Sequence, residues 1–484
     1  ARIWHTFIYG LYKGMKIVVT YMNDTFVSID CEAHIAMELD DYFTFKVPGY
    51  RFMPAYKNKI WDGTIHLFNL RKGTLYYGLI PRLIDFCNQN GYHPVIDEKI
   101  KQNANDGVSA YDIEELVSKL KLSSNLKPIK PRDYQLNGTY IALKKKRALL
   151  LSPTSSGKSL IIYMTIRGIL ERIEPERKVL IVVPTTGLVS QMYDDFMDYS
   201  HYDHDFNIET MCHKIMAGSN KTFIKQRIVI STWQSIYKMP RQWFDQFSAL
   251  IIDEAHLAKA NSIKKIAENM IDCPYKIGLT GTLDGTKTHQ LVLEGLTGSV
   301  HQIVKTKELM NKKQVAELTI KAILLQYPDD ERKEVVKWKY QDQVEYTEKH
   351  RKRNAFLAAL AISQRKNCLM LFNKREHGKM LYDLIRNKVG NERPVYYITG
   401  EMSGDKRNEL RHAIEDHENA IVLASYGVFS TGVNIKNLHS VIFCSSVKSK
   451  IRTLQSIGRG LRMGKNKESV VLYDIVDDLS WKKR

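Results

Sequence analysis

The chain has 484 residues, of which 44% are hydrophobic and 26% are charged, and its formal net charge is +19. This length predicts two or three domains, and the composition argues against intrinsic disorder. No apolar run approaches the ~18 residues that a membrane-spanning helix needs, so we expect no membrane partner. The positive charge favours a polyanionic partner, nucleic acid before a membrane surface, although a merely solvated basic surface is the alternative.

The 6 cysteines are scattered along the chain, and none of them forms a Cys-x-x-Cys pair. This spacing argues against a disulfide framework and against a zinc site. It is typical of a protein in a reducing compartment, so we expect a cytoplasmic location.

The first part of the chain predicts a small α/β domain over residues 15–97. Residues 1–14 fit poorly with the pattern that begins at Met15, and we expect them to be an added segment rather than part of the natural protein. The pattern from Met15 on predicts two strands, a helix, a hairpin and a second helix that ends at Gly91, over residues 16–20, 25–29, 33–42, 64–69 with 74–78, and 81–90.

Residues 50–61 of this domain interleave aromatic side chains with basic ones. Arg51, Lys57, Lys59 and Trp61 are the candidates for DNA contact, because such a mixture can stack on bases and pack against the sugar-phosphate backbone. The alternative is that the aromatic residues form the core of this small domain and the lysines are simply solvated.

Residues 98–127 are polar around one amphipathic stretch at 110–122, and we expect a linker there. Two regions that alternate apolar strands with helical segments come next, at 128–317 and 318–484, and each predicts a parallel sheet with crossover helices. Ligands of such sheets bind at the carboxyl ends of the strands. The predicted strands are 148–151, 179–183, 228–231, 250–252 and 276–279, then 368–372, 395–398, 420–424, 441–443 and 470–474.

An apolar strand, a loop of small residues and an apolar helix succeed one another across residues 149–162. Small residues let backbone N–H groups point at phosphate oxygens, and the helix adds its positive dipole end. Lys158 would reach the terminal phosphates, and the Ser159 hydroxyl would hold Mg²⁺. The usual pattern opens with Gly where this chain has Ser152. The other loop residues expected to contact the nucleotide are Thr154, Ser155, Ser156 and Gly157.

Asp253 and Glu254 come directly after the predicted strand 250–252. We expect that strand to lie beside the strand that feeds the phosphate loop. Asp253 would then hold Mg²⁺ through water, and Glu254 would polarise the water that attacks the γ-phosphate. The alternative is a helix N-terminus, which favours acidic residues.

Gln455, Arg459 and Arg462 are spaced so that they share one face of a helix. Guanidinium groups that face a nucleotide across a domain cleft stabilise transition-state charge as arginine fingers. The alternative is a basic amphipathic helix on the surface.

Together these motifs resemble the motor core of superfamily-two helicases with a DEAH-type motif, from about residue 127 to the end. A narrower likeness, to the recombination and branch-migration helicases of T-even-like phages, covers nearly the whole chain after Met15. It rests on residues 49–52, 61–63, 183–186, 424–432 and 447–450. The motifs of the broader resemblance are Arg132-Asp133-Tyr134-Gln135, residues 152–159, Pro184-Thr185-Thr186, Thr232-Trp233-Gln234, Asp253-Glu254-Ala255-His256, Thr280-Gly281-Thr282, residues 431–434 and residues 455–462.

The resemblance implies two tandem RecA-like motor domains preceded by a small α/β DNA-binding domain. It also implies that Gln135 reads the adenine edge, that Arg132 stacks on the base, and that Gly432 and Asn434 lie near the ribose, where Asp is commoner than Asn. His256, Thr280 and Thr282 would couple hydrolysis to domain closure. The residues expected to touch one nucleic-acid strand are Thr185, Thr186, Thr232, Trp233, Thr399, Ser425 and Thr431.

The activity implied is ATP-driven and Mg²⁺-dependent unwinding and migration of branched DNA, with double-stranded DNA, single-stranded DNA and RNA–DNA hybrids as further partners. We expect a monomer, located in the infected bacterial cell if the chain is phage-encoded. Phosphate contacts position a strand without reading its sequence, so an RNA helicase remains an alternative. An ATP-switched clamp or annealing protein and the motor subunit of a restriction system are two more.

Overall fold

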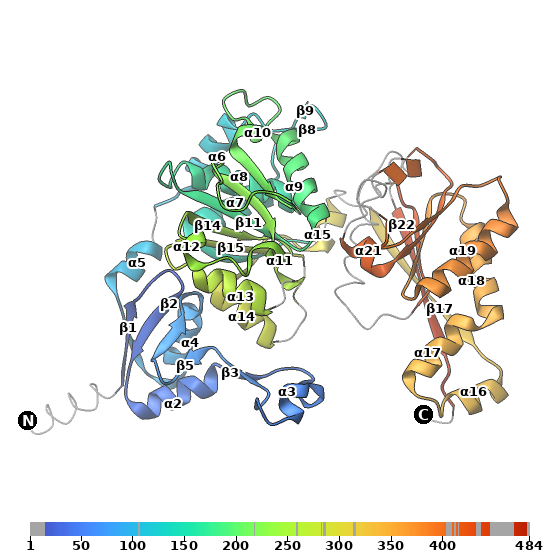
Figure 1. Ribbon diagram of the computed structural model, residues 1–484, viewed down its shortest axis with the longest axis horizontal. Coiled ribbons are helices and arrows are strands. Elements are labelled where there is room, and N and C mark those ends of the chain that lie inside the picture. The colour runs from blue at the N-terminus through green and yellow to red at the C-terminus, as the bar shows by residue number, and fades with distance from the viewer. Residues whose placement is uncertain are drawn as a thin grey trace, which may run out of the picture. The chain divides into compact units, whose positions relative to one another are not determined.

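A computed structural model describes the chain in two compact units, which divide near residue 304. Its architecture is the predicted one: a small α/β domain, then two parallel-sheet domains (Figure 1). No helix among the described residues is both long and apolar enough to cross a membrane. The residues described are 15–104, 107–153, 155–216, 218–257, 260–281, 283, 287–312, 316–402, 409–410, 413–414, 416–431, 437–445 and 469–481.

The N-terminal domain is built on a five-stranded sheet in the order β5-β6-β2-β1-β7. Both predicted helices are present, and α4 ends where Gly91 takes the left-handed conformation with φ of 74°. The bounds are β1 (Lys16–Tyr21), β2 (Phe26–Asp30), α2 (Ala33–Tyr42), β5 (Phe68–Asn69), β6 (Thr74–Tyr76), α4 (Ile80–Asn90) and β7 (His93–Ile96).

The predicted hairpin is only half correct. β5 pairs with β6, but β4 (Thr64–His66) pairs with β3 (Thr44–Lys46) in a separate two-stranded sheet. The reason is local: Leu67 and Phe68 are both buried, so the alternation of inward and outward side chains breaks there and the chain changes its pairing partner.

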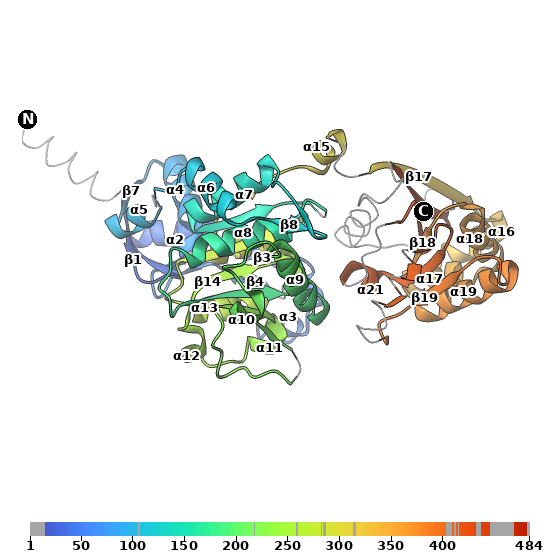
Figure 2. The same ribbon diagram turned by 90° about the horizontal axis from the view of Figure 1, so that it is seen from above.

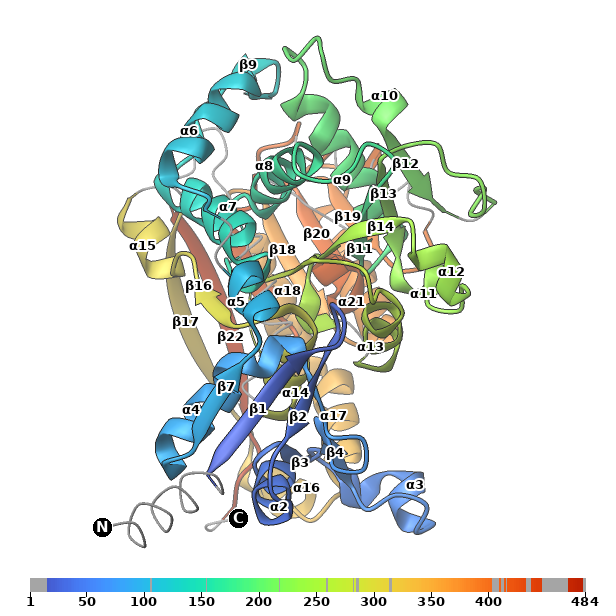
Figure 3. The same cartoon turned by 90° about the vertical axis from the view of Figure 1, so that its left-hand side faces the viewer.

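Between β3 and β4 the chain projects away from the domain (Figure 3). The projection carries the short helices η1 (Tyr50–Phe52) and α3 (Pro54–Lys57). We call residues 49–63 the tip.

Two helices occupy residues 98–127: α5 (Glu98–Ala104) and α6 (Ala110–Lys119). Ser109 and Asp112 form a capping box at the start of α6. Helix α6 contacts α7 (Asp133–Lys145), and its side chains Ile113 and Leu116 are buried, so this segment packs on the first motor domain.

The first motor domain has a seven-stranded sheet in the order β12-β13-β11-β14-β15-β10-β16, and all its pairings are parallel. One expectation is wrong: β14 does not lie beside β10, because β15 runs between them. The strands are β10 (Arg147–Leu151), β11 (Lys178–Val183), β12 (Cys212–Ile215), β13 (Ile228–Thr232), β14 (Phe247–Ile252), β15 (Tyr275–Thr280) and β16 (Val300–Gln302). The helices that bear on the site are α8 (Lys158–Leu170), α9 (Thr186–Tyr199), α13 (Ala260–Asn269) and α14 (Lys287–Thr297).

The second motor domain has a six-stranded parallel sheet in the order β17-β22-β21-β18-β20-β19. Helices α18 and α19 lie on one face of it (Figure 2). The bounds are β17 (Glu317–Gln326), α16 (Asp329–Val335), α17 (Tyr340–Lys349), α18 (Arg351–Ser363), β18 (Cys368–Phe372), α19 (Arg375–Val389), β19 (Val395–Ile398), β20 (Ile421–Ser425), α21 (Tyr426–Thr431), β21 (Ser440–Phe443) and β22 (Ser469–Asp478).

Candidate nucleotide and nucleic-acid sites

The phosphate loop leaves β10 at Ser152, which is fully buried. Its backbone N–H donates to Thr280 O at 2.9 Å, and its carbonyl accepts from Lys158 Nζ at 3.4 Å. Ser156 Oγ donates to Pro153 O at 2.6 Å and closes the loop on itself. Ser152 therefore fits the position where Gly is usual, because the loop stays compact. Thr154 lies outside the described residues.

Gly157 caps the N-terminus of α8 with φ of 79°, a conformation that favours glycine. A Cβ atom here would overlap Nε2 of Gln135. Gln135 is 5% exposed, and its Oε1 accepts a hydrogen bond from the backbone of Arg132 at 2.9 Å. The side chain of Gln135 thus lies against the phosphate loop, beside the start of the helix that carries Lys158.

Four residues that were predicted separately form a continuous series of contacts. Lys158 Nζ lies 3.3 Å from Glu254 Oε1. Oε2 of the same carboxylate lies 3.5 Å from Nδ1 of His256, which lies 2.6 Å from Oγ1 of Thr280. His256 and Thr280 are buried. Lys158, Glu254, His256 and Thr280 therefore meet in one polar cluster.

Glu254 also has an unusual backbone, with φ of 49°. A non-glycine residue in the left-handed region costs about 1–3 kcal/mol and is found most often at functional sites. The conformation turns the chain after β14, so that Asp253 and Glu254 are both presented at the carboxyl edge of the sheet.

Asp253 is 7% exposed. Burial, and then the charge of Glu254, raises the pKa of its carboxyl above the ordinary value. A buried carboxylate of this kind is stabilised by a cation, so its chemistry fits Mg²⁺. Ser159 Oγ lies 2.8 Å from the hydroxyl of Tyr199. These donors suit an ion that keeps water and phosphate ligands, as Mg²⁺ usually does, and within the described residues no three His, Cys, Asp or Glu side chains gather as a metal cage.

In the first motor domain, the predicted nucleic-acid residues lie at the same edge. Val183, the last residue of β11, pairs with Thr232, the last residue of β13, and Thr185 comes two residues after the end of β11. Thr185 caps α9, which begins at Thr186, by accepting from Leu188 N at 3.4 Å. Trp233 is 4% exposed, and its ring belongs to the hydrophobic core.

In the second motor domain, Ile398 pairs with Ala424, so Thr399 directly follows β19 where Ser425 ends the neighbouring strand β20. Thr399 is 7% exposed, and Ser425 is partly buried. The remaining predicted residues lie outside the part of the chain that the structure describes: the side chain of Thr431, and Thr282, Gly432, Asn434, Gln455, Arg459 and Arg462.

The tip combines charge with exposed apolar surface. Arg51 Nε donates to Tyr50 Oη at 3.2 Å, and Tyr50 packs edge-on against Tyr56 with their ring centroids 4.7 Å apart. Trp61 Nε1 donates to Thr64 O at 2.7 Å. Lys57 and Lys59 are exposed. Tyr50 and Tyr56 therefore pack on each other, and neither they nor Trp61 belong to the buried core of the domain.

Two further tip residues were not predicted from the sequence. Phe52 is 80% exposed and Ile60 is 79% exposed. Exposed apolar side chains mark an interaction site where they gather in a patch, and Met53, which is 38% exposed, is next to Phe52 in the chain. The available sequence signal was that both lie in a short segment in which apolar and polar residues do not alternate regularly. Gly49 and Gly63 flank this segment.

Three family models match the chain. Residues 16–97 match the N-terminal domain of the DNA helicase UvsW. Residues 114–285 match the family described as type III restriction enzyme, res subunit, and residues 351–464 match the helicase conserved C-terminal domain.

Similar proteins agree with these matches. The ATP-dependent DNA helicase uvsW of Enterobacteria phage T4 is 38% identical over 96% of this chain and 91% of its own length. A DNA 3'-5' translocase, XPB2 of Sulfurisphaera tokodaii, is 22% identical over 71% of this chain and 81% of its own. The crystal structure of T4 UvsW superposes with a TM-score of 0.55 at 36% identity, covering 97% of this chain and 92% of that one.

Proposed function

Because the chain belongs to the UvsW family of ATP-dependent DNA helicases, we propose that it unwinds and branch-migrates branched DNA, including four-way junctions, forks and RNA–DNA loops, during recombination-dependent replication and repair. The exposed tip of the N-terminal domain carries this proposal. It offers cations for phosphate groups and apolar side chains for bases that have lost their stacking partners. A DNA branch point presents both phosphate groups and such unstacked bases.

On the ATPase side, Lys158 would bind the terminal phosphates, and Ser159 and Asp253 would hold Mg²⁺, which neutralises phosphate charge when bound. Glu254 would polarise the attacking water, and its Oε1 lies 3.3 Å from Lys158 Nζ, next to where the phosphates would bind. His256 would pass a change at Glu254 to Thr280 through the 2.6 Å contact between them. Gln455, Arg459 and Arg462 would supply the transition-state contacts from the second motor domain.

On the DNA side, hydroxyl groups at the ends of neighbouring strands would contact phosphates of one strand. Such contacts suit movement along any sequence. The tip would engage the branch point, where Phe52 would stack on an exposed base face at about 1–3 kcal/mol and Ile60 would pack against apolar parts of a neighbouring nucleotide. Arg51, Lys57 and Lys59 would hold the neighbouring backbone. We propose that a monomer suffices, because both parts belong to one chain.

The test compares tip variants on two substrates. Phe52→Ala with Ile60→Ala should lower the rate of unwinding of a four-way DNA junction about tenfold, while ATPase stimulated by single-stranded DNA stays within about twofold. Tyr111→Ala is the matched control, since Tyr111 is 71% exposed but lies on α6. Equal junction unwinding by the tip variant and wild type would overturn the assignment of the tip. If single-stranded RNA stimulates the ATPase as much as DNA or more, the assignment of DNA as the substrate is overturned.

A further inference from the structure

The N-terminal domain shares a hydrophobic core with the first motor domain. One cluster of buried side chains runs from Leu79 and Leu83 of the N-terminal domain to Leu293 and Leu296 of α14. Burial on this scale is typical of the inside of a domain rather than of a mobile interface. Polar contacts in two places also join the two domains.

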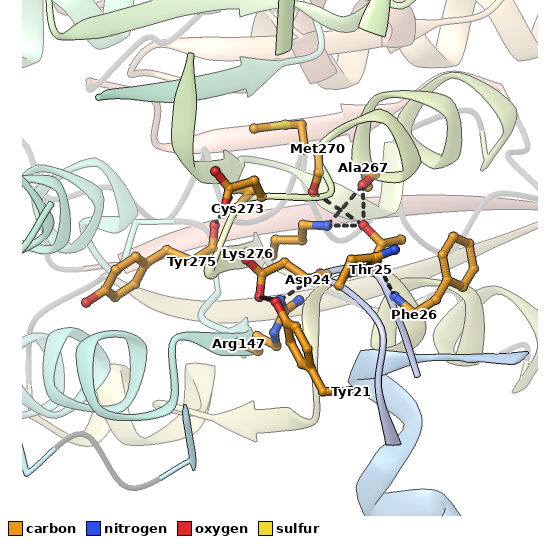
Figure 4. Close-up of polar contacts among 12 residues, drawn as sticks. Tyr21, Asp24, Thr25, Phe26, Arg147, Ala267, Met270, Cys273, Tyr275 and Lys276 are labelled. Atoms are coloured by element: carbon orange, nitrogen blue, oxygen red, sulfur yellow. Dashed lines mark hydrogen bonds and ion pairs between the residues drawn. The ribbon is translucent and has the colours of Figure 1, made fainter. Parts of the chain in front are cut away.

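The first place is the turn between β1 and β2 (Figure 4). Lys276, at the start of β15, donates from Nζ to Thr25 Oγ1 at 2.7 Å and to Ala267 O at 3.0 Å. The backbone N–H of Asp24 donates to Ile271 O at 2.8 Å, and Arg147 pairs with the carboxylate of Asp24 at 3.1 Å.

Lys276 is 1% exposed. Burial, and then the charge of Arg147, lowers the pKa of its amine to about 7. Its hydrogen bond to Thr25 joins the first motor domain to the N-terminal domain at a site closed to water.

The second place is α14. A Cβ atom at Gly78 would overlap the carbonyl oxygen of Glu294, so the two backbones touch. Arg82 forms a two-point ion pair with Glu294, with Nε to Oε2 at 2.9 Å and Nη2 to Oε1 at 3.0 Å. The side chain of Glu294 is 3% exposed. Removing its cation would leave a buried carboxylate with only a neutral donor, Gln290 Nε2 at 2.6 Å.

The elements that receive the N-terminal domain are those attached to the catalytic motifs. Helix α13 comes after Asp253–His256, and Tyr76 of the N-terminal domain donates to Glu268 on it at 2.7 Å. Strand β15 ends at Thr280, and α14 is the next helix along the chain. The N-terminal domain therefore contacts the segments that come after the two hydrolysis motifs. We call these contacts, Thr25–Lys276, Tyr76–Glu268 and Arg82–Glu294, the seat.

We propose that the N-terminal domain stays bound to the first motor domain throughout the ATPase cycle. The positioning residues that hold it there are Arg82, Glu294, Thr25 and Lys276. The tip then moves as one body with the sheet of the first motor domain, and each domain closure displaces the tip against the DNA. This inference rests on the proposed function. It implies that junction unwinding needs the seat, whereas ATP hydrolysis on single-stranded DNA does not.

A disulfide tests whether the domain ever leaves its seat. A Cβ atom at Gly295 would lie 3.3 Å from Cβ of Tyr76, close to the ~3.5–4.5 Å of natural disulfides. Tyr76→Cys with Gly295→Cys should unwind a four-way junction at the same rate, within about twofold, oxidised or reduced. The single variants under oxidation are the controls. Loss of unwinding on oxidation that a reductant restores would overturn the proposal, because the domain would have to undock.

A charge reversal tests whether the seat is needed. Arg82→Glu should reduce junction unwinding at least about tenfold and leave ATPase with single-stranded DNA within about twofold. Adding Glu294→Arg should restore unwinding. A parallel loss of both activities, or no loss, would overturn the positioning role.

Failure of the proposed function has a different signature. Wild type would then fail to unwind the junction at all. Hydrogen exchange in the absence of DNA still measures whether the N-terminal domain stays bound to the first motor domain. The amide of Asp24 should remain protected from hydrogen exchange with ADP and with a non-hydrolysable ATP analogue alike. Loss of this protection in either nucleotide state would contradict the proposal that the N-terminal domain stays bound to the first motor domain.

Discussion

The Nζ atom of Lys158 lies 3.3 Å from Oε1 of Glu254. The two residues come from loops at the ends of β10 and β14, and β15 separates these strands in the sheet. Their side chains meet because the carboxyl ends of parallel strands share one edge. The pair gives Lys158 a carboxylate partner that nucleotide phosphates would replace, and this places Glu254 next to the phosphates it is proposed to act on.

Glu254→Gln should abolish hydrolysis while ATP still binds. The amide keeps the shape of the side chain but loses the basicity needed to activate water, so we expect turnover to fall by about 10²–10⁴-fold. Steady-state ATPase and binding of a fluorescent ATP analogue measure the two properties. Turnover like that of wild type would rule out Glu254 as the base.

Thr280→Val should uncouple hydrolysis from unwinding. The change removes the hydroxyl that contacts His256 at 2.6 Å but keeps the shape of the side chain. We expect unwinding to fall about tenfold and DNA-stimulated ATPase to change less than about threefold. Thr297→Val is the control, because Thr297 is also fully buried and its hydroxyl donates to Leu293 O at 2.8 Å. If both variants behave alike, the effect is one of stability.

Gly157→Ala should weaken ATP binding at least about tenfold, since alanine at this φ costs about 1–2 kcal/mol and its Cβ displaces Gln135. Gly138→Ala is the matched control. Gly138 lies in α7, and a Cβ atom there would have its nearest contact at 3.4 Å, with Ile161. Nucleotide titration of both variants measures the effect, and unchanged affinity in Gly157→Ala would contradict the loop assignment.

Lys276 should make stability depend on pH. Burial lowers its pKa from 10.5 to about 7, so above pH 7 the unfolded chain binds more protons at this site than the folded one. Stability from this site therefore rises with pH between about 7 and 10.5. Lys276→Met removes that contribution and should flatten the rise. Denaturant midpoints at pH 7 and pH 9 measure it, and an equal rise in both proteins would contradict the buried amine.

The central strands and the loops at their ends could be predicted because a parallel sheet buried on both faces leaves long apolar runs in the sequence. Val179–Val183 and Cys368–Phe372 are examples, and both were found as strands. Strand order leaves no such trace. The place of β15 between β14 and β10 depends on how the crossover helices pack, which no local pattern records.

Side-chain roles that depend on long-range packing were also hidden. Trp233 comes after a strand in a motif position, yet it is 4% exposed because the core lies beneath it. Phe52 and Ile60 look like core residues by type, yet they lie on the tip. Arg82 and Glu294 are 212 positions apart in the chain, so their ion pair could not be inferred from sequence spacing.

The most direct test of the branched-DNA motor is steady-state ATPase with no nucleic acid, linear duplex, single-stranded DNA, a four-way DNA junction and single-stranded RNA, each at two salt concentrations. We predict that the junction stimulates most and that its effect falls as salt rises, since phosphate contacts release counterions. Equal or greater stimulation by RNA, or no stimulation by any nucleic acid, would contradict this function.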